Sequence, residues 1–447
     1  MINLKPKRIK KVNTKNRRIS GFFPTKEALN TMRQIQKYQN SDIMSQQPVL
    51  WDRAKNFNIY DTNNNCWIDF SSTIFVANSG HANPRIVKAI KNSADKLLHA
   101  YSYPTIERAR YLKKLINFLP NYLQKACLLN SGTEASERAI KIARLYGKQY
   151  GKKIIVGHFG NYHGKTLGAA MLSGNKNDCD WVGYKDPNIF RLKFPYPWSL
   201  SKKISGKKLF FEDLKILKAK QKTQKICAFF LETYQGWGAI FYPKDYVTEL
   251  EKWCKKNNVL LIFDEIQSGF GRTGKLFGYQ HYSVKPDLVV CGKGISSSLP
   301  LSAVFGNSKL LDLDTNYTST HGGHPLCCIA GEANLDEIKK RNLIKKSNEL
   351  GKILFKEVKR WQNKFDGLIP YIEGRGLVCG VFFAKAGNKN QFNIELCNLI
   401  VENCLKKGVF NIKTNRGTLK IAPPLTITKS ALLEGLSVIY DTIKEII

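Results

Sequence analysis

A lysine flanked by two glycines follows a short apolar run in the second half of the chain. The run is Leu288–Cys291, and Lys293 stands between Gly292 and Gly294. Glycine lets other groups approach the backbone closely, and a lysine at the mouth of a buried strand loses part of its hydration. That loss lowers the pKa of the amine and frees it for Schiff-base chemistry. By itself the pattern is also typical of a surface lysine in a turn, so other residues must decide.

Small hydroxyl residues and a glycine stand between an apolar run at 126–129 and a helical pattern. They are Ser131, Gly132 and Thr133. At a helix N-terminus such residues offer backbone N–H groups, hydroxyls and the positive end of a dipole, which together can bind a phosphate. An ordinary N-cap with Glu134 in the first turn is the alternative. Neither this loop nor the one at Lys293 is a complete G-x-x-x-x-G-K-[ST] motif, which disfavours nucleotide hydrolysis.

Three further side chains suit a bound heterocycle. Asp264 ends an apolar run and can accept a hydrogen bond from a protonated ring nitrogen, Gln267 can reach a ring hydroxyl, and Tyr162 can stack on the ring. Each is also compatible with ordinary packing or solvation. A phosphate cradle, a stacking ring, an aspartate and a glycine-flanked lysine, in that order, predict pyridoxal phosphate as the cofactor.

Apolar runs and helical patterns alternate through the middle of the chain. Runs at 125–129, 153–156, 226–231, 259–263 and 288–291 predict strands, and 133–146 and 244–256 predict helices. This alternation favours an α/β fold with a mostly parallel central sheet and helices on both faces. Ligands of such sheets lie at the carboxyl ends of the strands, where the candidate residues fall.

Long helices and short strands after residue 325 indicate a smaller α+β domain. In this part of the chain, helices are expected at 326–346, 350–365 and 393–407. A further helix is expected much earlier, at 85–98. The domain organisation that we expect is a basic, flexible N-terminal arm at 1–20, an N-terminal segment at 21–75 that packs with the small domain, a large cofactor-binding domain at 76–325 and a small domain at 326–447.

The composition sets limits on the class of protein. The formal charge of +36 comes from 71 Lys and Arg against 35 Asp and Glu, yet no stretch interleaves basic and aromatic residues as a single-strand binder does, so nucleic acid is not expected. No apolar run reaches the roughly 18 residues of a membrane span.

Eleven scattered cysteines without a CxxC pair indicate reduced thiols in a cytoplasmic protein. His321 and His324 lack further ligands at zinc-site spacing, so no metal is expected.

The sequence resembles the class III, ω-amino acid type aminotransferases of pyridoxal phosphate fold type I, from about residue 67 to 428. The motifs that carry the resemblance are SGTEA at Ser131, YHG at Tyr162, LETYQG around Glu232, FDEIQSGFGRTG from 263, CGKG from 291, THGGHPL at Thr320, GRGL from 374 and APPL from 422.

The resemblance assigns roles residue by residue. Lys293 would carry the cofactor aldehyde as an imine, Asp264 would pair with the pyridine nitrogen, and Glu232 would gate the substrate. Thr320 would reach the phosphate of the neighbouring subunit, which implies a homodimer with shared sites. The residues expected to bind the cofactor are Ser131, Gly132, Thr133, Tyr162, His163, Glu232, Asp264, Gln267, Lys293 and Thr320.

Two lysines depart from the pattern of many members. Lys165 follows the HG pair where carboxylate-binding members have arginine, and Lys420 stands where arginine pairs with the gating glutamate. A lysine offers a point charge in place of a bidentate fork, which argues against acetylornithine or ornithine as the donor. We expect a ping-pong transfer from a terminal primary amine, namely an ω-amino acid, a diamine or an amino sugar, to a 2-oxo acid. The alternatives are an aminomutase or decarboxylase on the same scaffold and, from a different class, a cofactor-binding regulator.

Overall fold

A seven-stranded sheet forms the centre of the larger lobe. The computed structural model describes residues 5–174, 179–200, 204–220, 222–414 and 416–447. The strand order is β10-β9-β11-β14-β15-β16-β8; β16 runs antiparallel to β15 and β8, and the other pairs are parallel, which confirms the predicted mostly parallel sheet. The strands are β8 (Lys125–Leu129), β9 (Ile154–His158), β10 (Ile189–Leu192), β11 (Ile226–Glu232), β14 (Leu260–Asp264), β15 (Leu288–Cys291) and β16 (Ser302–Gly306).

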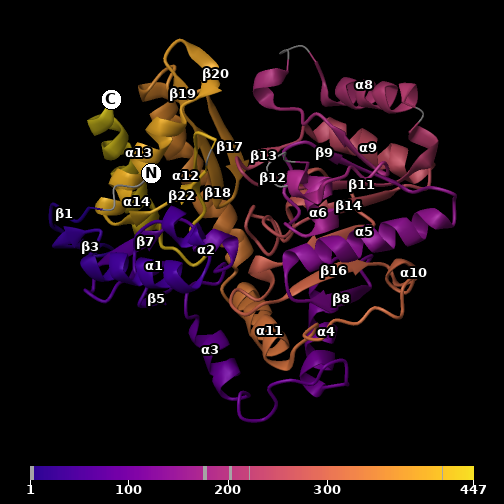
Figure 1. Cartoon of the computed structure of the whole chain (residues 1–447), viewed down its shortest axis with the longest axis horizontal. Helices are drawn as coiled ribbons and strands as arrows, with labels where there is room; N and C mark the ends of the chain where they lie inside the picture. Colours follow the sequence, from indigo (N-terminus) through magenta and orange to yellow (C-terminus); the bar gives the residue numbers. More distant parts are fainter. Residues whose placement is uncertain (1–4, 175–178, 201–203, 221, 415) are drawn as a thin grey trace.

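Both faces of this sheet are buried. Successive strand side chains point to opposite faces, so in β14 Leu260 and Ile262 join the apolar cluster beneath α5 (Gly132–Lys148). Leu261 and Phe263 join the cluster on the other face, which α9 (Lys244–Lys256) covers with α8 (Gly206–Ala219) beside it (Figure 1). Strands that are apolar at every position are typical of a sheet covered by helices on both sides.

The C-terminal part forms a smaller lobe around an antiparallel sheet of order β17-β18-β23-β22. The predicted helices 326–346 and 350–365 are wrong in their bounds, because Asn342 takes a left-handed φ of 48° and separates two helices at that point. The elements are α11 (Pro325–Lys340), α12 (Leu343–Lys364), β17 (Tyr371–Arg375), β18 (Val378–Phe382), β19 (Ala384–Lys385), β20 (Asn388–Phe392), α13 (Ile394–Lys406), β21 (Val409–Phe410), β22 (Ile412–Lys413), β23 (Thr418–Ile421) and α14 (Lys429–Ile446).

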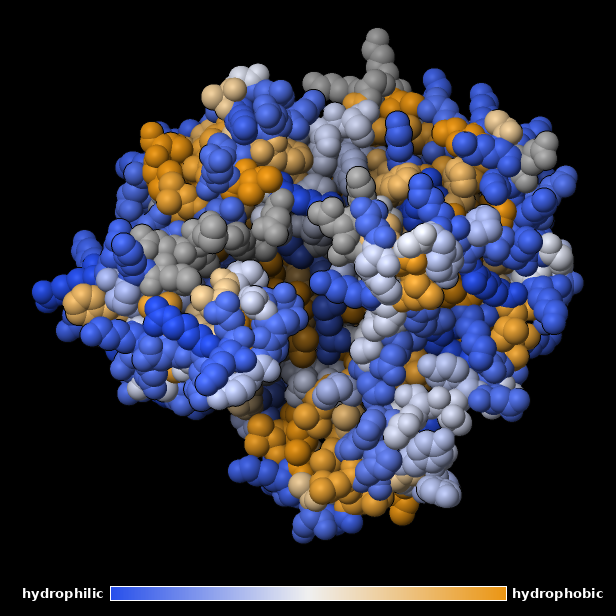
Figure 2. Space-filling view, viewed as in Figure 1, coloured by the Kyte–Doolittle hydropathy of each residue, from blue (hydrophilic) through white to orange (hydrophobic). Residues whose placement is uncertain are grey.

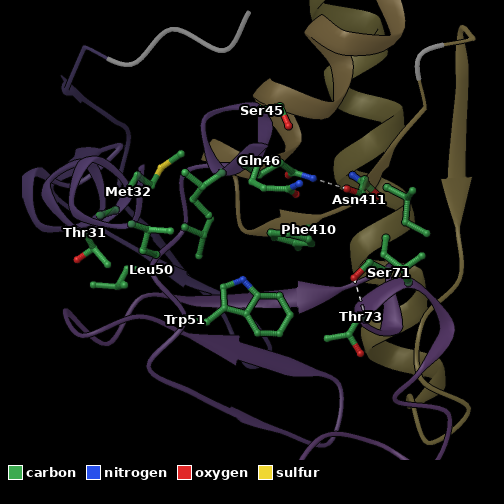
Figure 3. A pocket seen from close by; sticks show the side chains of 17 residues that line it. Thr31, Met32, Ser45, Gln46, Leu50, Trp51, Ser71, Thr73, Phe410 and Asn411 are labelled. Atoms are coloured by element: carbon green, nitrogen blue, oxygen red, sulfur yellow. Dashed lines mark hydrogen bonds between the residues drawn. The ribbon is translucent and has the colours of Figure 1, made fainter. Parts of the chain in front are cut away.

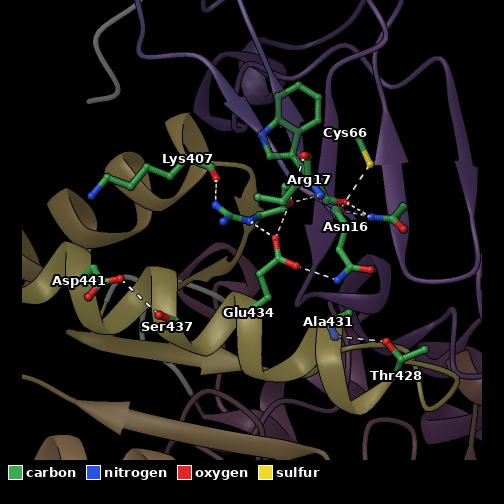
Figure 4. A network of polar contacts seen from close by, with 12 residues as sticks. Asn16, Arg17, Cys66, Lys407, Thr428, Ala431, Glu434, Ser437 and Asp441 are labelled. Carbon is green, nitrogen blue, oxygen red and sulfur yellow. Dashed lines mark hydrogen bonds and ion pairs between the residues drawn. The ribbon is translucent and has the colours of Figure 1, made fainter.

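The basic N-terminal segment docks on the smaller lobe. Strand β3 (Arg18–Ile19) pairs with β7 (Cys66–Asp69), which pairs in turn with β21. Arg17 Nε lies 2.7 Å from Glu434 Oε1 of α14, and its Nη1 donates to the Lys407 carbonyl (Figure 4). The expectation of a flexible arm is therefore wrong for residues 5–20, because these contacts tie the segment to α13 and α14. Residues 1–4 lie outside the described part.

The remaining N-terminal elements are β1 (Lys7–Arg8), β2 (Val12–Asn13), β4 (Phe22–Phe23), α1 (Lys26–Tyr38), β5 (Arg53–Lys55), β6 (Asn58–Tyr60), α2 (Ser72–Phe75), α3 (Pro84–Lys91) and α4 (Ile106–Phe118). Among them, β5 and β6 extend the sheet that contains β7, and α3 and α4 contact α11. Helix α3 ends at Lys91, seven residues earlier than expected, where Asn92 caps it. Figure 2 shows a hollow between the two lobes. None of the helices in the described ranges has the length and apolar character needed to cross a membrane.

Candidate active site

The carboxyl ends of the parallel strands bring four predicted residues to one edge of the sheet. Glu232 is the last residue of β11 and Asp264 the last of β14, and the two are register partners. Ser131 follows β8, and Lys293 stands two residues after β15. This edge is where parallel sheets bind their ligands, so the strands alone place an amine, two carboxyl groups and a helix N-terminus at one site.

Lys293 stands on a loop that neighbouring side chains hold firmly. Its φ of 46° lies in the left-handed region, which costs energy for a residue other than glycine. Asn334 Nδ2 donates to the carbonyls of Gly294 and Ile295, 2.9 Å each. A Cβ on Gly294 would stand 2.3 Å from Asn78 Nδ2, so this position needs glycine. Burial lowers the pKa of Lys293, while the nearby carboxyl groups oppose that shift.

Asp264 is fixed through both of its oxygen atoms. Oδ1 accepts a hydrogen bond from the Ile266 N–H at 2.9 Å, and Oδ2 lies 2.8 Å from His163 Nδ1. The His163 ring packs on Phe230, and its backbone N–H donates to Ser173 Oγ at 2.8 Å. The resemblance groups His163 with the cofactor-binding residues; in the structure its polar contact is with Asp264, so its action on a cofactor would pass through that carboxylate.

The N-terminus of α5 has the shape of an anion site. Ser131 and Glu134 form a reciprocal capping box, which satisfies the N–H groups of those two residues. The N–H groups of Gly132 and Thr133 have no acceptor within the helix and remain for a ligand. Thr133 Oγ1 lies 2.6 Å from Thr166 Oγ1. A Cβ on Gly132 would stand 2.9 Å from Ile266 Cδ1, so any larger residue here would press on the Ile266 side chain.

A buried polar cluster lies beside this edge. Glu232 accepts from the N–H groups of Tyr162 at 3.0 Å and Gly236 at 3.2 Å. Lys420 Nζ donates to the Gly236 carbonyl and, at 3.2 Å, to Gln267 Oε1. Burial raises the pKa of Glu232 to about 8, and burial lowers the pKa of Lys420 to about 7. No ion pair within 4 Å joins Glu232 to Lys420 in the part of the chain that the structure describes.

Three predicted residues lie further out. Tyr162 is 45% exposed and contributes its backbone N–H to the Glu232 contact. Lys165 is exposed, next to the contact between Thr133 and Thr166. Thr320 is exposed in the loop before α11, and its carbonyl lies 2.9 Å from His99 Nε2. Within this chain, none of the hydrogen bonds or ion pairs of the described residues joins Thr320 to the group around Lys293.

Arg272 is a residue whose role the sequence analysis missed. It is fully buried, and its guanidinium ties both lobes and the N-terminal segment together. It donates to Leu377 O (2.8 Å), Pro423 O (2.6 Å), Ser72 Oγ (3.1 Å) and Asn78 Oδ1 (2.6 Å). The residue lies in the FDEIQSGFGRTG stretch, but only its partners, from distant segments, reveal what it does.

Glu265, next to the predicted Asp264, has a structural role. Its carboxylate is fully buried and accepts four hydrogen bonds, from Thr233 Oγ1 (2.5 Å), Ser268 Oγ (2.7 Å), Gly278 N (2.8 Å) and Tyr279 N (2.7 Å). Burial raises its pKa to about 7. These bonds hold the loop after β14, and with it the backbone that positions Asp264 and Gln267.

The residues at this edge fit pyridoxal phosphate. The N–H groups of Gly132 and Thr133 at the start of α5 can bind a phosphate, Asp264 can accept from a ring nitrogen, and the Lys293 amine has a lowered pKa. Among the described residues, no group of three or more His, Cys, Asp or Glu side chains is arranged to hold a metal ion.

Known proteins match nearly the whole chain. The family model for "Aminotransferase class-III" matches residues 40–443. An acetylornithine aminotransferase of Caldanaerobacter subterraneus subsp. tengcongensis is 31% identical over 413 residues, 91% of this chain and 97% of that protein. A leucine/methionine racemase of Thermococcus litoralis is 30% identical over 419 residues, 89% and 91% of the two chains.

A solved structure shares the fold. The crystal structure of the ornithine aminotransferase from Toxoplasma gondii superposes with a TM-score of 0.82 at 25% sequence identity, covering 95% of this chain and 96% of the other. The family model, the relatives and the fold indicate the same family. The chain belongs to the class III aminotransferases, which are pyridoxal phosphate-dependent enzymes of fold type I.

Proposed function

We propose that this aminotransferase takes the amino group of a terminal primary amine, that is an ω-amino acid, a diamine or an amino sugar, and passes it to a 2-oxo acid in a ping-pong reaction. The observation that supports this donor class is the Glu232–Lys420 cluster: the two side chains attract each other electrostatically, but no ion pair within 4 Å joins them among the described residues. A carboxyl group without such a partner is available to a second cationic or hydroxyl group of the donor.

We assign the following roles to the side chains at the sheet edge, and their positions support these roles. When bound, pyridoxal phosphate supplies the electron sink for the reaction. Lys293 would hold the cofactor and then move the donor's Cα proton as base and acid. Asp264 would keep the ring nitrogen protonated, and His163 would act through its contact with the Asp264 carboxylate. The remaining contacts would come from Tyr162 on the ring face, Gln267 on the ring oxygen, and Ser131, Gly132 and Thr133 on the phosphate.

The electrostatics of the cluster favour a cationic donor. Burial raises the pKa of Glu232 to about 8, which favours the protonated carboxyl group near neutral pH. A donor's second ammonium group within about 4–6 Å would favour the ionised carboxylate, since an opposite charge lowers a carboxyl pKa. Glu232 would then bind that group. A donor carrying an α-carboxylate gains nothing from this residue.

The two lysines weaken recognition of an α-carboxylate. Lys165 is exposed, and Lys420 already donates to Gly236 and Gln267. Neither offers the planar, bidentate fork of arginine. The relatives named for acetylornithine and ornithine would therefore differ from this chain in donor preference, even though the fold is shared.

The test is a comparison of half-reaction kcat/KM for putrescine, 4-aminobutyrate, an amino sugar and N-acetylornithine. The proposal expects a terminal amine to be the best donor. Lys420→Arg should shift preference toward N-acetylornithine, whereas Lys346→Arg should not. Lys346 is a suitable control because it is a half-buried lysine whose pKa is also lowered, to about 8, and which donates to a backbone carbonyl, that of Thr426.

Two results would reject the proposal. One is N-acetylornithine or ornithine as the best donor by tenfold or more. The other is interconversion of leucine enantiomers, without amino transfer, as the fastest reaction, which would align the chain with its racemase relative. The same assay, run with product analysis, also detects aminomutase or decarboxylase products.

We further propose a homodimer with shared active sites. Figure 2 shows apolar side chains gathered over α3, α4 and α11, below the hollow. The exposed apolar residues of this region are Val87, Leu97, Leu98, Tyr101, Tyr103 and Ile106. His99, in the middle of this stretch, contacts the Thr320 carbonyl. An apolar face of this kind is typically covered at a subunit interface. Such an interface would place Thr320 near the phosphate bound by the partner subunit.

A further inference from the structure

A cavity of about 680 Å³ lies in the smaller lobe, away from the carboxyl edge of the seven-stranded sheet (Figure 3). Its walls come from α1, the 3-10 helix η1 (Ser41–Ser45), the turn after β7 and the strands β21 and β22. The volume is in the range of sites that hold small molecules. None of the residues placed in the catalytic group lines it.

The lining of this cavity carries no charged side chain. The protein has 106 Lys, Arg, Asp and Glu residues, yet the cavity is lined by apolar residues and by Ser, Thr, Gln and Asn. The apolar part includes Met32, Ile35, Leu50, Trp51, Phe410 and Ile412. A charged amine or oxo acid would lose its hydration here without gaining a counter-charge. The occupant therefore differs in chemistry from the donor and acceptor of the amino transfer.

One of the polar lining residues, Asn411, has an unpaired side-chain amide. Asn411 is fully buried, and among the described residues neither its Nδ2 nor its Oδ1 has a hydrogen-bond partner. Gln47 Oε1 is likewise buried and unpaired, while Gln47 Nε2 donates to the Asn411 carbonyl at 2.7 Å. Buried polar groups are nearly always paired in native proteins. A partner for the Asn411 amide must supply one acceptor and one donor side by side.

The inner wall of the cavity is a turn of left-handed backbone. Four consecutive residues, Ser72 to Phe75, have φ values of 49°, 50°, 56° and 71°, a conformation that non-glycine residues rarely adopt in succession. Thr73 and Ile74 line the cavity. On the other side Ser72 Oγ donates to the Ala422 carbonyl at 2.6 Å, and the Phe75 ring centroid lies 4.4 Å from Lys420 Nζ. One turn thus separates the cavity from the Lys420 cluster.

We infer that this cavity binds an uncharged, mainly apolar small molecule with an adjacent hydrogen-bond donor and acceptor, of the primary carboxamide or lactam class. The apolar body lies among Trp51, Phe410 and the residues of α1. The polar end pairs with the Asn411 amide, which fixes β21 and β22 relative to α1. The occupant also packs on Thr73 and Ile74, so it holds the left-handed turn in place beneath Lys420.

Indole-3-acetamide is a suitable probe, with indole-3-acetate as its charged counterpart. Binding to the holoenzyme is measured by titration calorimetry, and amide hydrogen exchange is followed in peptides that cover residues 70–76. Wild type should bind the amide saturably and at least roughly tenfold more tightly than the acetate. The bound amide should slow exchange in the turn.

Two variants test the role of the Asn411 amide. Asn411→Leu keeps a side chain of similar size and should weaken amide binding by roughly tenfold or more, because two hydrogen bonds are lost. Asn398→Leu makes the same exchange on α13, at another asparagine with a buried, unpaired Oδ1, and should leave binding unchanged. Unfolding curves of both variants show whether they fold.

Four results would overturn the inference. They are no saturable binding of the amide to wild type, equal binding by Asn411→Leu, tighter binding of the acetate, and unchanged exchange in peptides 70–76 when the amide is bound. A change in oligomeric state in Asn411→Leu, measured by light scattering, would instead assign the cavity to a contact between two copies of the chain.

Discussion

His163 Nδ1 and Asp264 Oδ2 lie 2.8 Å apart at the carboxyl end of β14, and both side chains are buried. When Nδ1 carries the proton, the ring donates a hydrogen bond to the carboxylate. The second oxygen of Asp264 is held by the Ile266 N–H. Asp264 therefore has no rotational freedom that would let it turn away from a ring nitrogen in the site.

Removing the His163 donor should slow the chemistry without emptying the site. His163→Leu loses a hydrogen bond to a buried carboxylate, worth about 1.5 to 3 kcal/mol, so the half-reaction should slow by roughly 10- to 100-fold. His163→Asn, whose Nδ2 takes the place of Nδ1, should recover most of the rate. Asp264→Ala should cost more, about 10³-fold, or roughly 4 kcal/mol of barrier.

The pH dependence of the cofactor absorption spectrum distinguishes positioning from loss of structure. It should shift in His163→Leu and be close to wild type in His163→Asn, at equal cofactor content. If both variants had the same rate and spectrum, His163 would be a packing residue only, and the role given to its contact with Asp264 would be wrong.

A shared active site predicts complementation between two inactive subunits. Thr320→Ala should weaken cofactor retention, because the hydroxyl would bind the partner subunit's phosphate. Lys293→Ala should abolish turnover. Mixed dimers of the two would contain one site with both residues intact, so part of the activity should return after subunit exchange. Absence of recovery, after mass spectrometry has confirmed mixed dimers, would count against a shared site.

His158 should make the protein less stable in mild acid. Its ring is fully buried between Tyr242 and Tyr246, 3.1 Å from each hydroxyl, and burial lowers its pKa to about 3. The unfolded histidine has a pKa of about 6.5. Between these values the unfolded state binds a proton that the native state does not, so the free energy of unfolding falls as the pH falls.

Denaturant unfolding of wild type and His158→Gln at pH 7 and pH 5 measures how much His158 contributes to the pH dependence of the free energy of unfolding. From pH 7 to pH 5 the free energy of unfolding of wild type should fall by about 2 kcal/mol more than that of the variant. The fall is about 1.4 kcal/mol per pH unit once the pH is below the pKa of the unfolded histidine. Parallel losses in wild type and His158→Gln would show that other groups control acid stability.

Much of the large lobe was predictable because its strands are short apolar runs. Helix α9 and strand β15 have the predicted bounds, and the loops after the strands carry Lys293 and Asp264 to one edge. That placement needs only the alternation of elements and the rule for parallel sheets.

The side chains that hold the site together were not predictable in this way. Arg272 bonds to residues about 200 positions earlier and 150 later, and Asn334 reaches the Lys293 loop from α11. Such partners depend on how the lobes dock, which local patterns do not encode. The helix break at Asn342 depends on one left-handed residue, and the docking of residues 5–20 depends on Glu434, far along the chain.

The central claim is that Lys293 carries the cofactor, and borohydride reduction followed by peptide mapping tests it most directly. Reduction of the imine fixes the cofactor to the amine that holds it. The label should lie on the peptide that contains Lys293, and Lys293→Ala should remain folded but give no label there and no turnover. Label on Lys420, on Lys165 or on any other lysine of the wild-type holoenzyme would contradict the assignment.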